Sequence, residues 1–394
     1  MPVLKLALRN LLGAGLRSWL NIFILSVSFV IIIGCQGLYK GMGQQMERHS
    51  IDSYFGGGQY WQVNYDPFDV LTLDDAQGRV PPVLQKMIDE GKALPLLKRQ
   101  ATLYPRNRVL NITLNGIQLD QTVLDIPTAL LRDADAAIPA LIGDAMAKST
   151  GLRQGDTVVL RWRDAHGTYD AEEIYIAAVL NTPVGEIDGG QVWIPLDRMQ
   201  KMTGLPGAAT LIVVARGGNP QPLGGEAGQD WVLKDLAFLL ADTRGMMASQ
   251  YVEGGVMYAV FLFLAMLGIF DTQILAIYRR VKEMGTLLAL GTTKSDLVWI
   301  FTLEGTLHSV LAAALAFVYG TPLLLWFARV GFVLGDSYDQ LGFALGKAIY
   351  PIYTPGIVAG TTVFIIALTA LVSYLPCRRI AKLTPTEALR GKIT

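Results

Sequence analysis

The chain of 394 residues contains 33 basic and 33 acidic residues, so it has no net charge, and 52% of its residues are hydrophobic. A balanced charge argues against a nucleic-acid-binding protein, and a mean hydropathy of +0.37 is typical of membrane proteins. Cys35 and Cys377 both lie in apolar stretches, far apart in the sequence, and the three histidines are scattered. A disulfide framework or a metal site is therefore not expected.

The first apolar stretch predicts a transmembrane helix. Residues 1–17 form a basic amphipathic run, which we expect to be a helix on the cytoplasmic side, and residues 18–40 are almost wholly apolar. At about 1.5 Å per residue this stretch covers roughly 33 Å, enough to cross a bilayer. Its sequence Ile32-Ile33-Gly34-Cys35 is like a lipobox, but the apolar region is longer than a signal-peptide core. We therefore expect a retained first span.

Residues 41–250 have mixed charge and no spanning run, which predicts an inserted α+β domain with its own core. Alternation around Asn115-Gly116 predicts a hairpin, and residues 138–150 predict a helix. Apolar spacing from Asp230 to Ser249 predicts a helix that runs almost without a break into a second span at 251–278. Such a helix would carry motion between the two sides of a membrane, and a flexible joint near residue 250 would contradict that idea.

Two further spans follow at 297–328 and 355–377, separated by a short loop at 329–354. Gly320-Thr321-Pro322 is expected to kink or end the third span. The segment 279–296 and the tail 378–394 hold clustered Lys and Arg close to span ends, whereas the charged residues of 330–354 are mostly Asp. By the positive-inside rule both termini are cytoplasmic, and the large insert lies outside. The expected fold is thus a four-helix membrane protein with a large extracytoplasmic α+β domain.

The segment 279–296 between the second and third spans has the pattern of a short amphipathic helix. Met284, Leu287, Leu288 and Gly291 recur at spacings of three and four. Such a helix is too short to span the bilayer but can lie on its cytoplasmic face and present a surface to a soluble partner. The alternative is an ordinary basic loop that obeys the positive-inside rule.

Three motifs resemble one family of membrane proteins: Arg-Arg-x-x-Glu-x-Gly-x-x-x-Ala-Leu-Gly from Arg279, Leu-Glu-Gly at Glu304, and Pro-x-Glu-Ala-Leu-Arg from Pro385. They are similar to the permease subunits of the FtsX/MacB/LolCE family of ABC transporters, which also have four spans and one large first loop. The resemblance implies that the segment 279–296 is a coupling helix that docks on an ATPase. The residues that it places in this role are Arg279, Arg280, Glu283, Gly285, Leu288, Ala289, Leu290, Gly291, Lys294, Pro385, Glu387, Ala388, Leu389 and Arg390.

The same resemblance implies a non-catalytic subunit in the bacterial inner membrane. ATP and Mg would bind to a separate ABC ATPase, present in two copies, and this chain would bind no cofactor. The expected partners are a second permease subunit, identical or homologous, and a periplasmic acceptor or adaptor protein. In agreement, the sequence contains no Gly-x-x-x-x-Gly-Lys-Ser/Thr phosphate loop. The order Gly-x-x-Asp from Gly185 and Pro-Leu-x-x-x-Gln from Pro195 favours the lipoprotein-releasing branch.

Ionisable residues within the predicted spans are functional candidates, because a charge at mid-bilayer costs about 3 kcal/mol or more. Asp271 lies two turns before Arg279, and Glu304 and His308 share a helix face. The favoured interpretation places all three near the cytoplasmic end, where water and Arg279 or Arg280 can reach them. Asp271, Glu304 and Gly305 would then make packing or coupling contacts, without a proton relay.

Four functions remain open from the sequence. The leading one is ATP-driven release of a lipoprotein or another amphiphile. The alternatives are MacB-like efflux of a drug, peptide or toxin, FtsX-like signalling without a transported solute, and a membrane-anchored binding protein whose cytoplasmic loops are inert. No substrate-binding residue is predicted.

Overall fold

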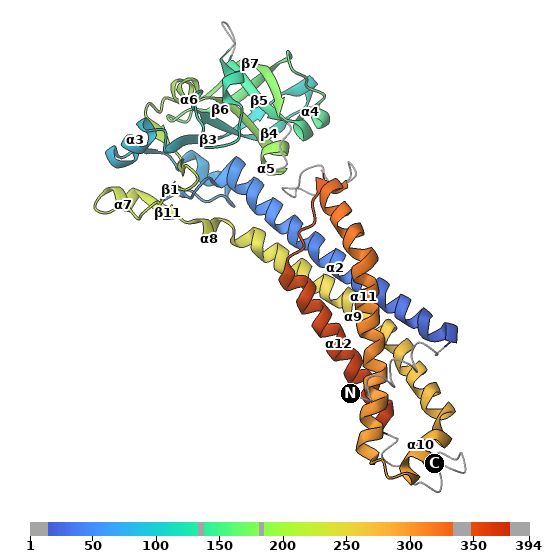
Figure 1. The fold of residues 1–394 in the computed structure, drawn as a ribbon. Helices are drawn as coiled ribbons and strands as arrows, with labels where there is room; N and C mark the ends of the chain where they lie inside the picture. The colour runs from blue at the N-terminus through green and yellow to red at the C-terminus, as the bar shows by residue number, and fades with distance from the viewer. Residues whose placement is uncertain (1–14, 133–137, 181–184, 334–347, 379–394) are drawn as a thin grey trace. The chain divides into compact units, whose positions relative to one another are not determined.

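A computed structural model of the protein describes residues 15–132, 138–180, 185–333 and 348–378 (Figure 1). These residues divide into two compact units. The helical unit comprises the described residues within Met1–Met42, Met247–Phe332 and Tyr350–Thr394, and the sheet unit those within Gly43–Met246 and Val333–Ile349. The predicted N-terminal amphipathic run and the tail from residue 379 onward lie outside the described residues.

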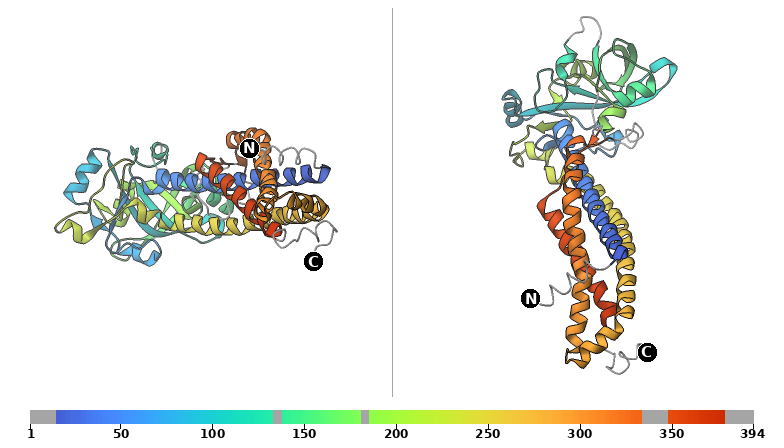
Figure 2. Two further views of the ribbon diagram at one scale, coloured as in Figure 1. Left: turned by 60° about the horizontal axis from the view of Figure 1, so that its bottom comes forward. Right: turned by 45° about the vertical axis from the view of Figure 1, so that its right-hand side comes forward.

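Among the described residues, four helices are long and apolar enough to cross a membrane. Their packed faces form one core of Ile22, Phe29, Met266, Ala312 and Ile365 with their neighbours, and Figures 1 and 2 show the helices running alongside one another. The helices of this unit are α2 (Gly15–Ser50), α9 (Ala241–Arg279), α10 (Val281–Ala289), α11 (Lys294–Val330) and α12 (Pro355–Cys377). Residues 43–50 of α2 and 241–246 of α9 belong to the sheet unit.

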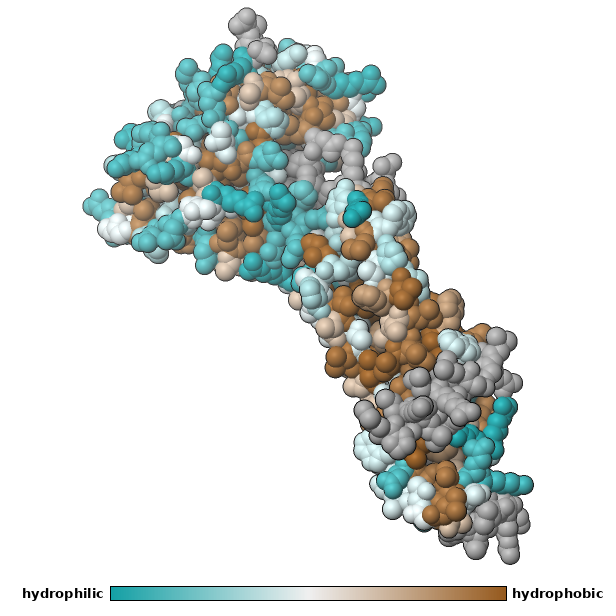
Figure 3. All heavy atoms as spheres, viewed as in Figure 1, coloured by the Kyte–Doolittle hydropathy of each residue, from teal (hydrophilic) through white to brown (hydrophobic). Residues whose placement is uncertain are grey.

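The outer surface of the long helices is apolar. Phe263 on α9, Phe317 on α11 and Val363 on α12 each expose about two thirds of their surface, and hydrophobic residues cover much of this unit in Figure 3, whereas hydrophilic residues cover most of the sheet unit. An apolar exposed face is unfavourable in water and favourable in lipid, so these helices suit a bilayer.

Small residues allow these helices to approach closely, as is typical of membrane helices. A Cβ atom at Gly254 would lie 2.9 Å from the Tyr39 ring, and one at Gly320 would meet the side chain of Val30. At Gly305 on α11, a Cβ would clash with Ser373 of α12 and approach Gln273 of α9 within 2.6 Å. The absence of a side chain at Gly305 therefore allows α11 to lie close to α9 and α12.

The sheet unit is built on one nine-stranded sheet with the order β11-β1-β10-β3-β4-β8-β5-β7-β6. An additional pairing of β6 with β3 closes the last six strands into a ring. The paired strands are β1 (Gln59–Gln62), β3 (Ala93–Leu103), β4 (Leu110–Ile117), β5 (Ile138–Gly143), β6 (Thr157–Arg163), β7 (Tyr169–Leu180), β8 (Gln191–Pro195), β10 (Leu211–Val214) and β11 (Trp231–Lys234). Two short pairs join β2 (Gly78–Arg79) to β9 (Ala208–Ala209) and β12 (Phe332–Val333) to β13 (Ala348–Ile349).

Alternating side chains of the ring strands, among them Leu160, Ile176 and Ile194, form one core with Met146 and Met199. A second core gathers around Trp193, Leu94 and Leu211, and β3 contributes to both. The short helices of this unit are α3 (Pro82–Asp89), α4 (Asp144–Thr150), α5 (Gly185–Gly190), α6 (Leu196–Thr203), α7 (Ala227–Asp230) and α8 (Leu236–Leu239).

Two local predictions in the sheet unit were wrong. Asn115-Gly116 is not a turn but lies inside β4, where Asn115 is fully buried and hydrogen-bonded to Gln191 at 3.2 Å. The predicted helix 138–150 is a buried strand, β5, followed by α4. Short apolar runs cannot distinguish a buried strand from a helix by periodicity alone.

The predicted helix over 230–249 begins later than expected. Trp231–Lys234 is the edge strand β11, paired with β1, and a single turn, α8, precedes α9. From Ala241 to Arg279, α9 is one helix, without a joint near residue 250. The expectation was that Gly320-Thr321-Pro322 kinks or ends the third span, and the end is not found, because α11 continues through Pro322 to Val330.

Candidate functional site

Helix α10 is held in a tight connection between α9 and α11. The chain turns at Arg280 (φ −106°, ψ 13°), and α10 then buries Val281, Met284 and Gly285 on one face. Met284 is part of a small core with Ile277 of α9, Leu297 and Phe301 of α11, and Cys377 of α12. The predicted amphipathic helix is thus present, and its buried face is anchored on three of the long helices.

Arg280 links α10 to α11 by three contacts. Its Nε donates to Glu283 Oε2 at 2.8 Å, its Nη1 donates to Glu304 Oε2 at 3.0 Å, and its guanidinium lies 4.9 Å from the centre of the Phe301 ring. Burial lowers the pKa of Arg280, but the hydrogen bond to Glu283 and the charge of Glu304 outweigh it and the net pKa is raised. The guanidinium is therefore a permanent charge that fixes the angle of this turn.

The C-terminal end of α10 is fixed by a Schellman motif. The Thr292 N–H donates to the Leu287 carbonyl at 3.0 Å, and the Gly291 N–H donates to the Leu288 carbonyl at 3.1 Å. Gly291 has a φ of +95°, a conformation that favours glycine. The next helix begins at once, with Thr293 Oγ1 accepting from the Asp296 N–H at 3.1 Å. The connection is therefore closed by backbone caps on both sides.

The opposite face of α10 is free for a partner within the described structure. Lys282, Thr286, Leu287, Ala289 and Leu290 are exposed, and Leu290 exposes 78% of its surface. An apolar tip flanked by Lys282 and Lys294 has the composition of a protein-docking surface.

The predicted coupling residues that the structure describes fall into two groups. Gly285 is buried, and Arg280 and Leu288 are half-buried, so these three position α10. Arg279, Glu283, Ala289, Leu290, Gly291 and Lys294 are exposed and can face a partner. Pro385, Glu387, Ala388, Leu389 and Arg390 lie outside the described residues.

The three ionisable residues predicted within the spans, Asp271, Glu304 and His308, have different surroundings. Glu304 is nearly buried and paired with Arg280, and its carbonyl oxygen lies 2.9 Å from His308 Nδ1. His308 Nε2 is buried without a hydrogen-bond partner in the part of the chain that the structure describes. Asp271 is exposed on α9 and is not part of this cluster.

Sequence reasoning missed two parts of the site. The Thr293–Asp296 cap could have been found, because Thr-x-x-Asp before an apolar run is a helix-start signal. Phe301 had no such signal, since only the fold brings its ring to the guanidinium of Arg280.

Comparison with known proteins bears on this region. Residues 255–385, which include α10, match the family model for the FtsX-like permease C-terminal domain. This part of the chain is therefore similar to the FtsX-like permease domain.

Curated relatives agree with this assignment. An uncharacterized ABC transporter permease of Methanocaldococcus jannaschii is 26% identical over 135 residues, which is 34% of this chain and 31% of that protein. Macrolide export ATP-binding/permease proteins MacB of Sodalis glossinidius and Psychrobacter arcticus are 27% and 24% identical over 132 and 123 residues. These matches cover 33% and 31% of this chain but only 18% and 16% of the MacB proteins. The chain thus spans a third or less of the length of these relatives.

One solved structure is similar to about half of the chain. The extracellular domain of the noncanonic ABC-type transporter YknZ from Gram-positive bacteria covers 48% of this chain and 94% of its own, at 16% identity and a TM-score of 0.27. At this TM-score the likeness supports no conclusion about the sheet unit.

Proposed function

We propose that the protein is the permease subunit of an ABC transporter that transmits ATP-driven motion to an extracytoplasmic domain. The observation that carries the proposal is the position of α10 within an FtsX-like permease domain, where Arg280, Met284 and the two caps fix a helix whose exposed tip is apolar. A rigidly held helix with a free apolar face can receive force from a second protein.

In this proposal the force comes from two copies of a separate ABC ATPase, which bind ATP and Mg, and a second permease subunit completes the complex. Helix α10 and both termini face the cytoplasm of a bacterial inner membrane, and the sheet unit lies outside. The uninterrupted course of α9 supports mechanical transmission, because a helix without a joint carries displacement along its axis.

The proposed substrate is a lipoprotein or another amphiphile that a periplasmic acceptor takes up. Moving an acyl chain into water costs about 0.8 kcal/mol per methylene, so such a permease needs an apolar cavity to receive the chain. A second candidate is efflux with an adaptor protein, because MacB relatives are named as macrolide exporters. FtsX-like signalling is the third.

The test uses the complex purified from the host's own membranes. Leu290→Asp places a charge on the exposed tip of α10 without touching its buried face, and we expect it to lower the vanadate-sensitive ATPase activity that co-purifies with the chain by at least about tenfold. Ala289→Asp should act in the same direction. Gly285→Asp is less informative, because Gly285 is buried and its replacement would also disturb packing.

The matched control is Val83→Asp, the same chemical change at an apolar side chain of α3 that is 61% exposed. Its ATPase activity should equal that of the unmodified complex. Unchanged activity in Leu290→Asp, or an equal loss in Val83→Asp, would contradict the proposal and favour a membrane-anchored binding protein.

A further inference from the structure

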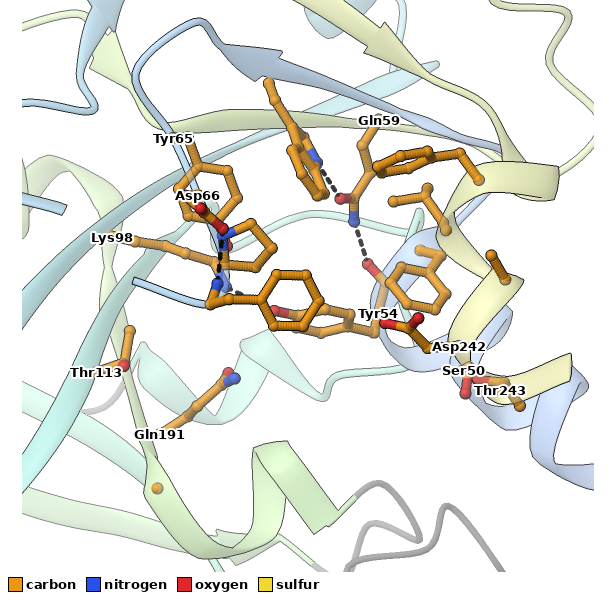
Figure 4. Close-up of a pocket in the computed structure, with 18 of the residues that line it drawn as sticks. Ser50, Tyr54, Gln59, Tyr65, Asp66, Lys98, Thr113, Gln191, Asp242 and Thr243 are labelled. Atoms are coloured by element: carbon orange, nitrogen blue, oxygen red, sulfur yellow. Dashed lines mark hydrogen bonds between the residues drawn. The ribbon is translucent and has the colours of Figure 1, made fainter. Parts of the chain in front are cut away.

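The sheet unit contains a cavity of about 760 Å³ that none of the predicted site residues touches. The cavity lies wholly within the sheet unit, between β1, β3 and the segments that flank them (Figure 4). Most of its lining is aromatic or aliphatic, and this volume suits a ligand of drug or lipid size. The principal apolar lining residues are Tyr54, Phe55, Trp61, Tyr65, Phe68, Leu73, Phe238 and Leu239.

One buried cation lines this apolar cavity. Lys98 on β3 is only 3% exposed, its ammonium donates to the Tyr54 hydroxyl at 2.9 Å, and it lies 4.9 Å from the centre of the Tyr54 ring. None of the ion pairs among the described residues involves Lys98. A buried ammonium without a carboxylate is costly, because its charge has lost water and gained only neutral partners.

The neighbouring phenol of Tyr65 cannot supply the missing negative charge. Burial raises the pKa of Tyr65 above its ordinary value, and the opposing effect of Lys98 is smaller, so this side chain stays neutral. Gln59, the other buried polar side chain beside Tyr54, is already bound on both sides: its amide donates to the Tyr54 carbonyl and accepts from the Trp61 indole at 2.7 Å (Figure 4).

The acidic lining residues lie toward solvent. Asp66 and Asp242 are both exposed, and Asp66 accepts a hydrogen bond from the Phe68 N–H at 2.9 Å. Exposed carboxylates are screened by water, so they do not neutralise a buried ammonium. Phe68 and Phe238 expose 83% and 53% of their surface, which places apolar side chains at the solvent-facing side of the same lining.

We propose that this cavity binds an amphiphile with a single acidic head group, whose carboxylate or phosphate pairs with Lys98 and whose apolar body lies against the aromatic lining. Charge complementarity favours this ligand, because an anion can pair with the buried ammonium of Lys98. Its apolar body can then fill the rest of the cavity and pack against the aromatic lining. The inference rests on the proposed function and narrows its substrate to an anionic amphiphile.

The test uses the full chain in nanodiscs of phosphatidylcholine and three probes with the same twelve-carbon chain and a mid-chain diazirine: dodecanoate, dodecanol and dodecyltrimethylammonium. After illumination, mass spectrometry locates the crosslinks. We expect dodecanoate to label cavity residues such as Trp61 and Phe238, at a yield at least about tenfold above that of the alcohol and the cation. Because crosslinks are assigned to residues, probe dissolved in the lipid does not interfere.

Lys98→Gln should lower the dodecanoate yield in the cavity about tenfold. Lys201→Gln, at an exposed lysine of α6, is the control and should leave it unchanged. Equal cavity labelling by all three probes, labelling confined to the long helices, or an unaffected Lys98→Gln variant would overturn the inference. The comparison of the three probes on the unmodified chain needs no variant. It therefore tests whether the cavity prefers an anionic head group even if Lys98→Gln fails to fold.

Failure of the proposed anionic ligand and failure of the proposed function can be distinguished, because crosslinking requires no ATPase. Loss of cavity labelling with normal Leu290-dependent ATPase activity would reject only the anionic ligand. Normal labelling with an ATPase that ignores Leu290→Asp would reject only the coupling role.

Discussion

At the scale of single residues, Arg280 determines how the turn between α9 and α10 is held. Its guanidinium is about one quarter exposed and the Glu304 carboxylate about one eighth exposed, at 26% and 12%. When an ion pair is partly buried in this way, removing only one partner lowers stability, because the remaining charge keeps its desolvation penalty. The exposed contact with Glu283, whose side chain is 64% exposed, contributes far less.

This asymmetry makes a prediction for a double-mutant cycle. Arg280→Met and Glu304→Met alone should each lower the free energy of unfolding by about 1–3 kcal/mol, whereas the double variant should cost less than the sum. Glu283→Gln should change stability by less than about 0.5 kcal/mol. Thermal unfolding in detergent, with ATPase activity as a second readout, measures all four; strictly additive losses would show that Arg280 and Glu304 do not act as a pair.

At the scale of elements, the ends of α10 matter more than its helix propensity, because a nine-residue helix is only marginally stable on its own. Gly291 supplies the positive φ that the Schellman motif requires, and the space around its Cα is open. A side chain there would meet no clash, so any cost of substitution comes from the backbone conformation.

Gly291→Ala should therefore lower stability by about 1 kcal/mol and reduce the co-purifying ATPase activity, because α10 loses its defined end. Gly255→Ala is the matched control: Gly255 lies inside α9, and its surroundings are equally open. There the change should be neutral or stabilising by up to about 1 kcal/mol. If both variants lose stability equally in thermal unfolding, the cap has no special role.

The elements that the sequence could predict were those with a strong length or charge signal. The four long helices are apolar over more residues than any soluble element needs, and α10 has a clear amphipathic spacing. The interior of the sheet unit gave no such signal. Asn115-Gly116 has the letters of a turn, yet tertiary packing against β8 places it in a strand.

The same limit applies to the sites. Local motifs identified α10, because its residues are contiguous. The cavity around Lys98 joins Tyr54, Trp61, Lys98 and Phe238, which lie on four separate segments. No spacing rule connects such residues, so only the folded sheet brings the ammonium to its apolar surroundings.

At the scale of the whole molecule, the chain comprises a helical unit, part of which is similar to the FtsX-like permease domain, and a sheet unit. The proposed function requires that the exposed tip of α10 and the sheet unit lie on opposite sides of the membrane. Positive residues near α10 favour the cytoplasm for that tip. Every functional alternative that involves an ATPase depends on this one feature.

The most direct test is therefore a labelling experiment on spheroplasts and inverted membrane vesicles with a membrane-impermeant maleimide. Leu290→Cys and Val83→Cys are introduced separately, because both target side chains are well exposed. The free cysteines Cys35 and Cys377 are replaced by alanine, so that only the introduced thiol can react. The proposed orientation predicts that Leu290→Cys reacts only in inverted vesicles and Val83→Cys only in spheroplasts. Labelling of Leu290→Cys from outside the cell would contradict it.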